Sequence, residues 1–280
     1  MPLINQTPYV LTVADGPMTP VVISVPHSGL AVDAEDEPLL ACDRQTLLRD
    51  ADLFVDRLVA SAPDLGATSL VATVSRYVLD VNRGLHEVDL SACPNWDRVG
   101  EAARPRGLIW RQSTEGHRVL ERPLTRSELQ SRVDRIHRPY HEALRRLLDE
   151  RRNQFGYAVL LDAHSMPSVG RTGHRDDGLK RADVVPGDNH GESCDPRLTQ
   201  LVVDHFQDVG LRVKLNEPYS GGYITRFYGQ PKAGFHAIQI ELNRSLYMDE
   251  PSVTWDETKG EALGAVIHAL VRKLLGLQLI

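Results

Sequence analysis

Apolar and polar residues follow two repeating patterns along the chain. Runs rich in Val, Ile and Leu predict buried strands, and apolar residues spaced three and four apart predict helices. We expect strands over residues 21–25, 157–162, 211–215 and 237–242, with one or two more in residues 67–84. We expect helices over residues 42–62, 125–147, 196–209 and 256–275. This alternation of strands and helices is typical of an α/β fold.

The helix that starts at Thr125 carries two local signals. Thr125 and Glu128 have the spacing of a capping box, in which each side chain bonds the other residue's backbone N–H. Pro139 lies further along the same run. Because proline lacks a backbone N–H and its ring clashes with the preceding turn, we expect the helix to be kinked or split there.

Composition limits the class of protein. The chain has 280 residues, and the absence of an internal repeat or linker favours a single α/β domain over residues 1–280. A net charge of −6 without a Lys/Arg-rich block argues against nucleic acid as a partner. The apolar runs fall short of the roughly 20 residues of a membrane helix, and the N-terminus lacks a signal-peptide pattern. With three widely spaced cysteines, the sequence indicates a cytoplasmic protein without a membrane partner.

Two of the predicted strands end in the same way. Residues 21–29 read VVISVPHSG and residues 157–166 read YAVLLDAHSM, so each apolar run leads into a His–Ser pair. Ligands of α/β proteins bind at strand ends, and neutral imidazole is the commonest metal ligand. His27 and His164 are therefore candidate metal ligands, with Asp162 two residues before the second. The alternative is that each histidine hydrogen-bonds backbone at its strand end.

Carboxylates are expected to complete this chemistry. A catalytic zinc ion needs about three protein ligands and an open position for water. Asp52 lies at the edge of the apolar face of the helix predicted over residues 42–62, while Asp50 lies further round. Glu241 lies inside an apolar strand, where desolvation favours proton exchange near neutral pH and suits a general base. The alternative for Glu241 is an ion pair with Arg244 or another arginine.

Arginine and asparagine side chains follow the strand region that ends near residue 84. Arginine binds a carboxylate at two points and, like asparagine, can stabilise a developing oxyanion. Arg76, Asn82 and Arg83 are candidates for these roles, and so is Arg226, which follows two glycines that let backbone approach a ligand. The alternative for each is a structural salt bridge. For His137 and His141, spaced i, i+4 on a helix, a structural role is favoured over chelation.

Eight short motifs occur in an order that resembles the N-formylglutamate amidohydrolase family, and they span residues 21–250. They are SVPHSG, LLRDADLFVDRL, SRYVLDVNRG, GLIWR, RPYHEAL, LLDAHSMPS, GGYITRFYG and IQIELNRSLYMDE. The resemblance implies hydrolysis of N-formyl-L-glutamate to formate and L-glutamate, a step of histidine degradation. The family is distantly similar to zinc carboxypeptidases, which implies a three-layer α/β/α fold with a central mixed sheet.

The resemblance also implies roles for residues. In the carboxypeptidase-like enzymes a strand-end histidine, a carboxylate three residues later and a second histidine hold zinc. Here the position three residues after His27 is Leu30, so we expect Asp52 as the third Zn²⁺ ligand, or else Asp50, beside His27 and His164.

The implied mechanism is metal-assisted hydrolysis of an amide. Glu241 takes the proton of the attacking water and passes it to the leaving amine, and Arg76 or Arg83 stabilises the oxyanion. Asn82 with Arg83, and Arg226, bind the two carboxylates of the small-molecule substrate. Two alternatives remain open: the same scaffold acting on another N-acyl or N-formyl amino acid or a small peptide, and a non-catalytic metal-binding protein.

Overall fold

The computed structural model describes residues 7–279 with the exception of 15, 98–104 and 172–175. The strands are β1 (Tyr9–Thr12), β2 (Val21–Val25), β3 (Thr68–Ala72), β4 (Ala158–Met166), β5 (Val184–Gly187), β6 (Phe235–Asn243), β7 (Met248–Asp249) and β8 (Thr254–Trp255). The α-helices are α1 (Arg44–Asp50), α2 (Val55–Leu58), α3 (Arg126–Arg132), α4 (Arg138–Phe155), α5 (Pro196–Asp208), α6 (Tyr223–Tyr228) and α7 (Glu257–Leu275). Shorter turns are η1 (Glu37–Leu39), η2 (Ala62–Leu65), η4 (Pro231–Ala233), η5 (Arg244–Leu246) and the π-helical η3 (Val133–His137).

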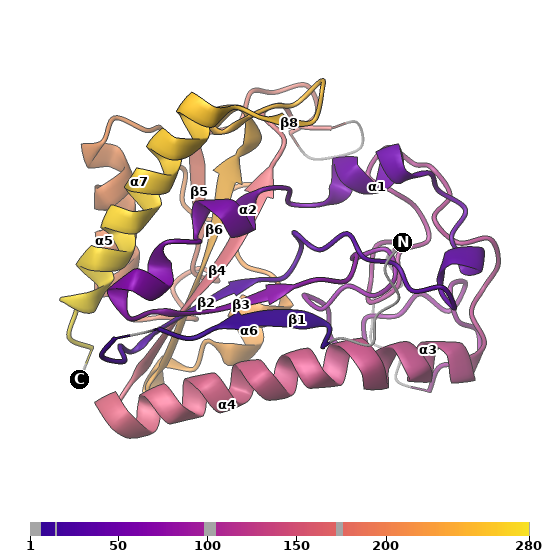
Figure 1. The fold of residues 1–280 in the computed structure, drawn as a ribbon, viewed down its shortest axis with the longest axis horizontal. Helices are drawn as coiled ribbons and strands as arrows, with labels where there is room; N and C mark the ends of the chain where they lie inside the picture. Colours follow the sequence, from indigo (N-terminus) through magenta and orange to yellow (C-terminus); the bar gives the residue numbers. More distant parts are fainter. Residues whose placement is uncertain (1–6, 15, 98–104, 172–175, 280) are drawn as a thin grey trace. The chain divides into compact units, whose positions relative to one another are not determined.

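A mixed sheet in the order β1-β3-β2-β4-β6-β5 forms the framework (Figure 1). Strands β2, β4 and β6 pair in parallel, and β5 pairs antiparallel to β6. All residues of β2 and β4 are buried, which explains their continuous apolar sequence, because a central strand is covered on both faces. The predicted α/β class with a central mixed sheet is confirmed. None of the helices in the described part of the chain is both long enough and apolar enough to cross a bilayer.

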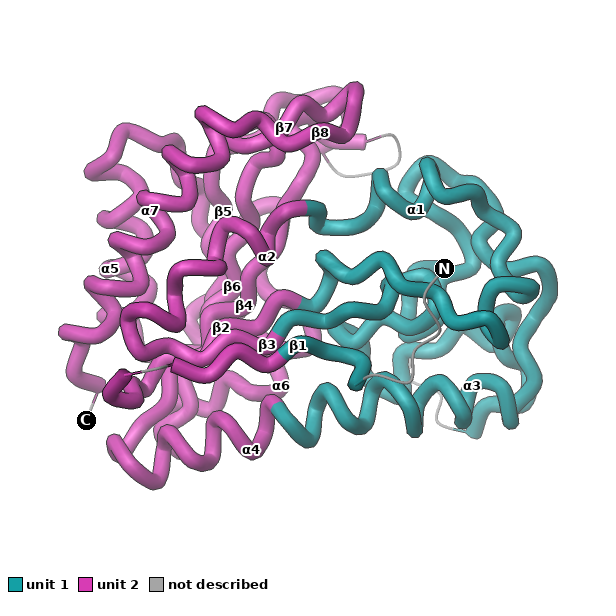
Figure 2. The backbone as a smooth tube through the Cα atoms, in the orientation of Figure 1, with its two compact units in different colours: residues 1–10, 26–53, 71–143 teal, residues 11–25, 54–70, 144–280 magenta. Residues whose placement is uncertain are grey.

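The chain divides into two compact units (Figure 2). Unit 1 comprises residues 1–10, 26–53 and 71–143, and unit 2 comprises residues 11–25, 54–70 and 144–280. Strands β2, β4, β5 and β6 belong wholly to unit 2, in which α5 and α7 contact each other and α6 contacts β4 and β6. That the whole chain acts as one domain stays a prediction.

The prediction of a single helix over residues 42–62 is wrong, because this segment forms two separate helices. Helix α1 ends at Asp50, Ala51 is extended with ψ 148°, and Phe54 has a left-handed φ of 66° before α2 begins. The interruption is stabilised from outside the segment, because the Asp52 N–H donates to the carbonyl of His27 at 2.9 Å. Asp52 therefore lies in an extended break between two helices and not on a helix face.

The prediction of one or two strands in residues 67–84 is confirmed by one, Thr68–Ala72, and residues 76–78 form a turn. The strand predicted over residues 211–215 is wrong. The segment over residues 211–215 meets the sheet at one bridge, between Val184 and Val213. Leu211 and Val213 are only partly buried and Leu215 is exposed, so the apolar alternation here does not mark a strand that the sheet covers.

The capping box at the start of α3 is confirmed. The Thr125 hydroxyl accepts from the Glu128 N–H at 3.2 Å, and the Glu128 carboxylate accepts from the Thr125 N–H at 2.7 Å. The predicted break near Pro139 takes the form of the π-helical turn η3, which ends directly before α4. Since Pro139 has no N–H to donate, widening the preceding turn removes the demand for that bond.

Thr125→Ala should lower the free energy of unfolding by about 1 kcal/mol, because it removes the acceptor for one N–H of the first helical turn. Urea denaturation measures this change. Thr125→Ser keeps the hydroxyl and should unfold like the natural protein; equal stability of all three proteins would show that the cap is energetically silent.

Candidate active site

His27 belongs to unit 1 and lies two residues after β2 ends. The chain makes a close approach here: a Cβ on Gly29 would lie 2.4 Å from the carbonyl carbon of Thr73, so only glycine fits. Ala31 then donates to the carbonyl of Thr73 at 2.9 Å. These contacts fix the backbone around His27, whose side chain is only 3% exposed.

The two imidazole nitrogens of His27 face two buried carboxylates. Nε2 lies 2.7 Å from Asp80 Oδ1, and Nδ1 lies 3.3 Å from Asp52 Oδ2. When Nε2 donates to Asp80, the lone pair of Nδ1 stands beside an anion, an arrangement that a cation stabilises. Two ligands of one tetrahedral zinc ion, each about 2.0–2.1 Å from the metal, lie about 3.3 Å apart. His27 and Asp52 thus form a His/Asp pair that can bind a metal ion.

Asp50 is a different kind of carboxylate. Its oxygens accept from the Tyr77 hydroxyl at 2.7 Å, from the Thr114 N–H at 2.8 Å and from the Thr114 hydroxyl. Burial, with Asp50 alongside, raises the pKa of Tyr77, so this phenol keeps the proton that it donates. Asp50 therefore ties α1 to residues 77 and 114, and Asp52 is the carboxylate beside His27.

Asp80 is the residue of unit 1 that sequence reasoning missed. Its carboxylate is fully buried and accepts hydrogen bonds from four groups: His27 Nε2, the Asn82 N–H, the Trp110 indole and the Arg76 guanidinium. Burial alone would raise the pKa of Asp80, but Arg76 and His27 hold it well below its ordinary value. The signal was a carboxylate inside the apolar run of residues 77–81, the same signal that singled out Glu241.

The candidate residues Arg76, Asn82 and Arg83 lie around Asp80. Arg76 donates to Asp80 through Nε and Nη2, and its guanidinium stacks 4.4 Å from the centre of the Trp110 ring. Arg83 contacts Glu87 at 3.4 Å, while its Nε is buried without a hydrogen-bond partner among the described residues. A buried donor of this kind costs free energy unless an acceptor meets it, and a ligand carboxylate is such an acceptor.

In unit 2, His164 repeats the pairing seen at His27. Residues two apart on a strand point to the same face, so Asp162 meets His164, with 3.2 Å between Oδ2 and Nε2. Asp162 also accepts from the hydroxyls of Ser24 at 3.0 Å and Thr225 at 3.1 Å. The Asp162–His164 pair is an ion-pair contact, and a carboxylate beside one imidazole nitrogen leaves the other nitrogen available to a ligand.

Glu241 lies opposite His164 in the register of β4 and β6. The side-chain amide of Gln239 donates to Glu241 Oε1 at 3.0 Å and accepts the Gly222 N–H at 2.7 Å. This second bond fixes which end of the amide faces the glutamate. Gln239 thereby connects Glu241 to the start of α6, which carries the exposed Arg226.

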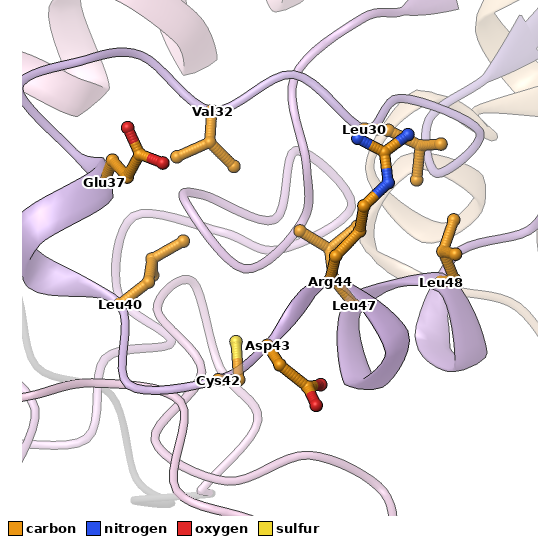
Figure 3. A pocket seen from close by; sticks show the side chains of 9 residues that line it. All are labelled: Leu30, Val32, Glu37, Leu40, Cys42, Asp43, Arg44, Leu47 and Leu48. Atoms are coloured by element: carbon orange, nitrogen blue, oxygen red, sulfur yellow. The ribbon is translucent and has the colours of Figure 1, made fainter. Parts of the chain in front are cut away.

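The pocket of about 200 Å³ in Figure 3 is separate from these residues. Its lining is mainly apolar and comes from residues 30–48, and none of the candidate residues contributes to it. The acidic cluster of Asp33, Glu35 and Asp36 is not a metal site either, because Arg135 forms an ion pair with each of the three.

Buried histidine–carboxylate pairs and a buried glutamate beside the central strands of an α/β sheet are typical of a hydrolase. The model of the N-formylglutamate amidohydrolase family matches residues 19–248. The chain belongs to that family. A crystal structure of N-formylglutamate amidohydrolase from Ralstonia eutropha JMP134 superposes with a TM-score of 0.88 at 31% identity, covering 97% of this chain and 98% of the other.

Curated relatives agree with this assignment. The N-formylglutamate deformylase of Pseudomonas putida is 37% identical over 261 residues, which covers 91% of this chain and 92% of the relative. That of Pseudomonas aeruginosa is 34% identical with the same coverage. A structure from Agrobacterium tumefaciens, at 20% identity and a TM-score of 0.70, shares the fold.

Asp50→Ala should lower the free energy of unfolding by about 1–3 kcal/mol, because it leaves the buried Tyr77 hydroxyl and the Thr114 donors with fewer acceptors. Chemical denaturation measures the loss, and a D50A protein as stable as the natural one would show that these hydrogen bonds contribute nothing to stability.

Proposed function

We propose that this protein hydrolyses N-formyl-L-glutamate to formate and L-glutamate. The observation that carries the proposal is the likeness to the Pseudomonas putida N-formylglutamate deformylase along nearly the full length of both chains. The buried pairs of histidine and carboxylate, together with Glu241, supply the groups that hydrolysis of an amide requires. In cells this would be a cytoplasmic step of histidine degradation.

We propose further that His27, Asp52 and His164 bind one zinc ion. The 3.3 Å between His27 Nδ1 and Asp52 Oδ2 supports this, as does the carboxylate partner of each imidazole. Within unit 2, Ser24 of β2 pairs with Asp162 of β4 in parallel, and His164 follows two residues after Asp162 on the same strand. Nitrogen and carboxylate ligands of this kind suit zinc.

Zinc held by these residues would polarise the formyl carbonyl and lower the pKa of a water molecule. Glu241 takes the proton of that water as its oxygen attacks the formyl carbon, and gives it to the amine nitrogen as the C–N bond breaks. Gln239 keeps the carboxylate of Glu241 oriented through these two transfers. Arg76 stabilises the negative charge that develops on the formyl oxygen.

The two carboxylates of the substrate need cationic partners. Asn82 and Arg83 suit one of them, since the buried Nε of Arg83 lacks an acceptor among the described residues. Arg226 suits the other, because its guanidinium is exposed and donates to the carbonyl of Gly221 at 3.3 Å, which places it beside the two glycines. Binding a dianion in a protein of net charge −6 then depends on where these arginines lie and not on total charge.

A chelation experiment tests the metal dependence. Formate release from N-formyl-L-glutamate should cease after dialysis against a strong chelator and return when about one equivalent of Zn²⁺ is added. Full activity of the metal-free protein would contradict the proposed mechanism, and a metal-loaded protein without formate release would contradict the proposed substrate.

Glu241→Gln should keep one metal ion per chain and lower kcat by several orders of magnitude, because the amide cannot accept the water proton. Metal analysis and a formate assay provide the two readouts. Glu142→Gln, a change at an exposed glutamate, is the matched control and should alter neither. Near-normal turnover of E241Q would show that another residue is the base.

Arg226→Ala should raise KM for N-formyl-L-glutamate roughly 10–100-fold, which corresponds to the loss of about 1.5–3 kcal/mol from a charged hydrogen bond. For N-formyl-L-glutamine, whose side chain is neutral, the rise should be smaller. Steady-state kinetics with both substrates measures the difference, and an equal effect on the two would place Arg226 away from the side-chain carboxylate.

A further inference from the structure

Three side chains from the helical segment of residues 126–143 bond the loop that carries the candidate substrate-binding residues. Arg132 Nη1 donates to the carbonyl of Val78 at 2.8 Å. His137 Nε2 lies 2.9 Å from the carbonyl oxygen of Arg83, and His141 Nε2 lies 2.8 Å from that of Val81. Because a carbonyl only accepts, each imidazole must carry its proton on Nε2 and donate it.

The π-helical turn η3 makes this arrangement possible. In an α-helix of 3.6 residues per turn, positions five apart, such as Arg132 and His137, point about 140° away from each other. The wider turn over Val133–His137 turns His137 back toward the side from which Arg132 reaches the loop. His141 follows four residues later in regular α-helix. Single π turns of this kind occur frequently at functional sites.

The two imidazoles also support each other. Their ring centres lie 4.1 Å apart with the planes 35° from parallel. Burial lowers the pKa of His137, so its ring stays neutral and can stack on His141 without charge repulsion. His137 and His141 therefore pack as a pair, and this pair donates to two carbonyl groups of the loop.

The two carbonyls that the histidine pair contacts, those of Val81 and Arg83, lie on either side of Asn82. The Asn82 N–H itself donates to Asp80 Oδ1 at 2.9 Å, so the backbone around Asn82 is fixed at three points. We infer that His137 and His141 are positioning residues for Asn82 and Arg83, setting where these two side chains meet a substrate carboxylate. This inference rests on the proposed function, because it assigns a substrate to that loop.

The first test compares variants of His141, which is only partly buried and so is the safer position to change. In the zinc-loaded protein, His141→Leu removes the donor and should raise KM for N-formyl-L-glutamate about tenfold, while kcat changes less than about threefold. His141→Gln keeps an N–H donor near the position of Nε2 and should restore KM to within about threefold of the natural value.

The second test asks whether His141 acts through Arg83. Arg83→Ala alone should raise KM, and adding His141→Leu to it should raise KM by less than about twofold more, because residues that act in one chain of contacts are not additive. A purely structural role predicts independent effects instead. The corresponding pair with His137→Leu, which removes the donor to the carbonyl of Arg83, repeats the measurement from the other carbonyl.

Specific outcomes would overturn the inference. They are an unchanged KM in His141→Leu, full additivity with Arg83→Ala, or a loss of metal and kcat that His141→Gln does not restore. Failure of the proposed function looks different, because the natural zinc-loaded protein would then release no formate from N-formyl-L-glutamate. Activity of the natural protein is therefore measured first, and the His141 variants are interpreted against it.

Discussion

The arrangement of unit 1 depends on the buried carboxylate of Asp80. An isolated charge in the protein interior is costly, and Asp80 is tolerated because Arg76, His27, the Trp110 indole and the Asn82 N–H all bond it. Each of these bonds also has a consequence for the chemistry. The bond to Nε2 selects the His27 tautomer whose Nδ1 faces Asp52, and the bond to Asn82 anchors the loop of residues 76–84. One interior charge thereby fixes a metal-ligand candidate and the substrate-binding candidates together.

Unit 2 also places a buried aspartate beside a histidine, but the other partners of this aspartate differ. Asp162 takes the place of Asp80, but its partners besides His164 are the neutral hydroxyls of Ser24 and Thr225. Gln239 does the corresponding work for Glu241, since its amide is oriented by Gly222 and can only donate to the glutamate. In both units a side chain proposed to do chemistry contacts a second, buried side chain that itself bonds further groups of the same unit. This is how a site keeps its geometry before a ligand arrives.

Local sequence predicted the parts of the fold and site that depend on local patterns. Strands β2, β4 and β6 followed from apolar runs, and His27, His164 and Glu241 stood out because they end or interrupt such runs. The break between α1 and α2 was not predictable, because it depends on the bond from Asp52 to His27, 25 residues away in the chain. The roles of Asp50 and Asp80 could not be predicted for the same reason. The role of a buried carboxylate depends on its hydrogen-bond partners, and here these are brought near only by the fold. The π turn before Pro139 was not predictable either, because it is associated with contacts from Arg132 and His137 to a loop about 50 residues earlier in the chain.

We propose that one zinc ion joins His27, Asp52 and His164, and that an aspartate lies beside a ring nitrogen of each imidazole. An anomalous-difference map at the zinc edge, from crystals of the zinc-loaded protein, tests this directly. We expect one peak about 2.0–2.1 Å from Nδ1 of His27, from Nδ1 of His164 and from a carboxylate oxygen of Asp52, while Asp80 stays on Nε2 of His27. A peak at other side chains, or coordination through Nε2 with the bond to Asp80 broken, would contradict it.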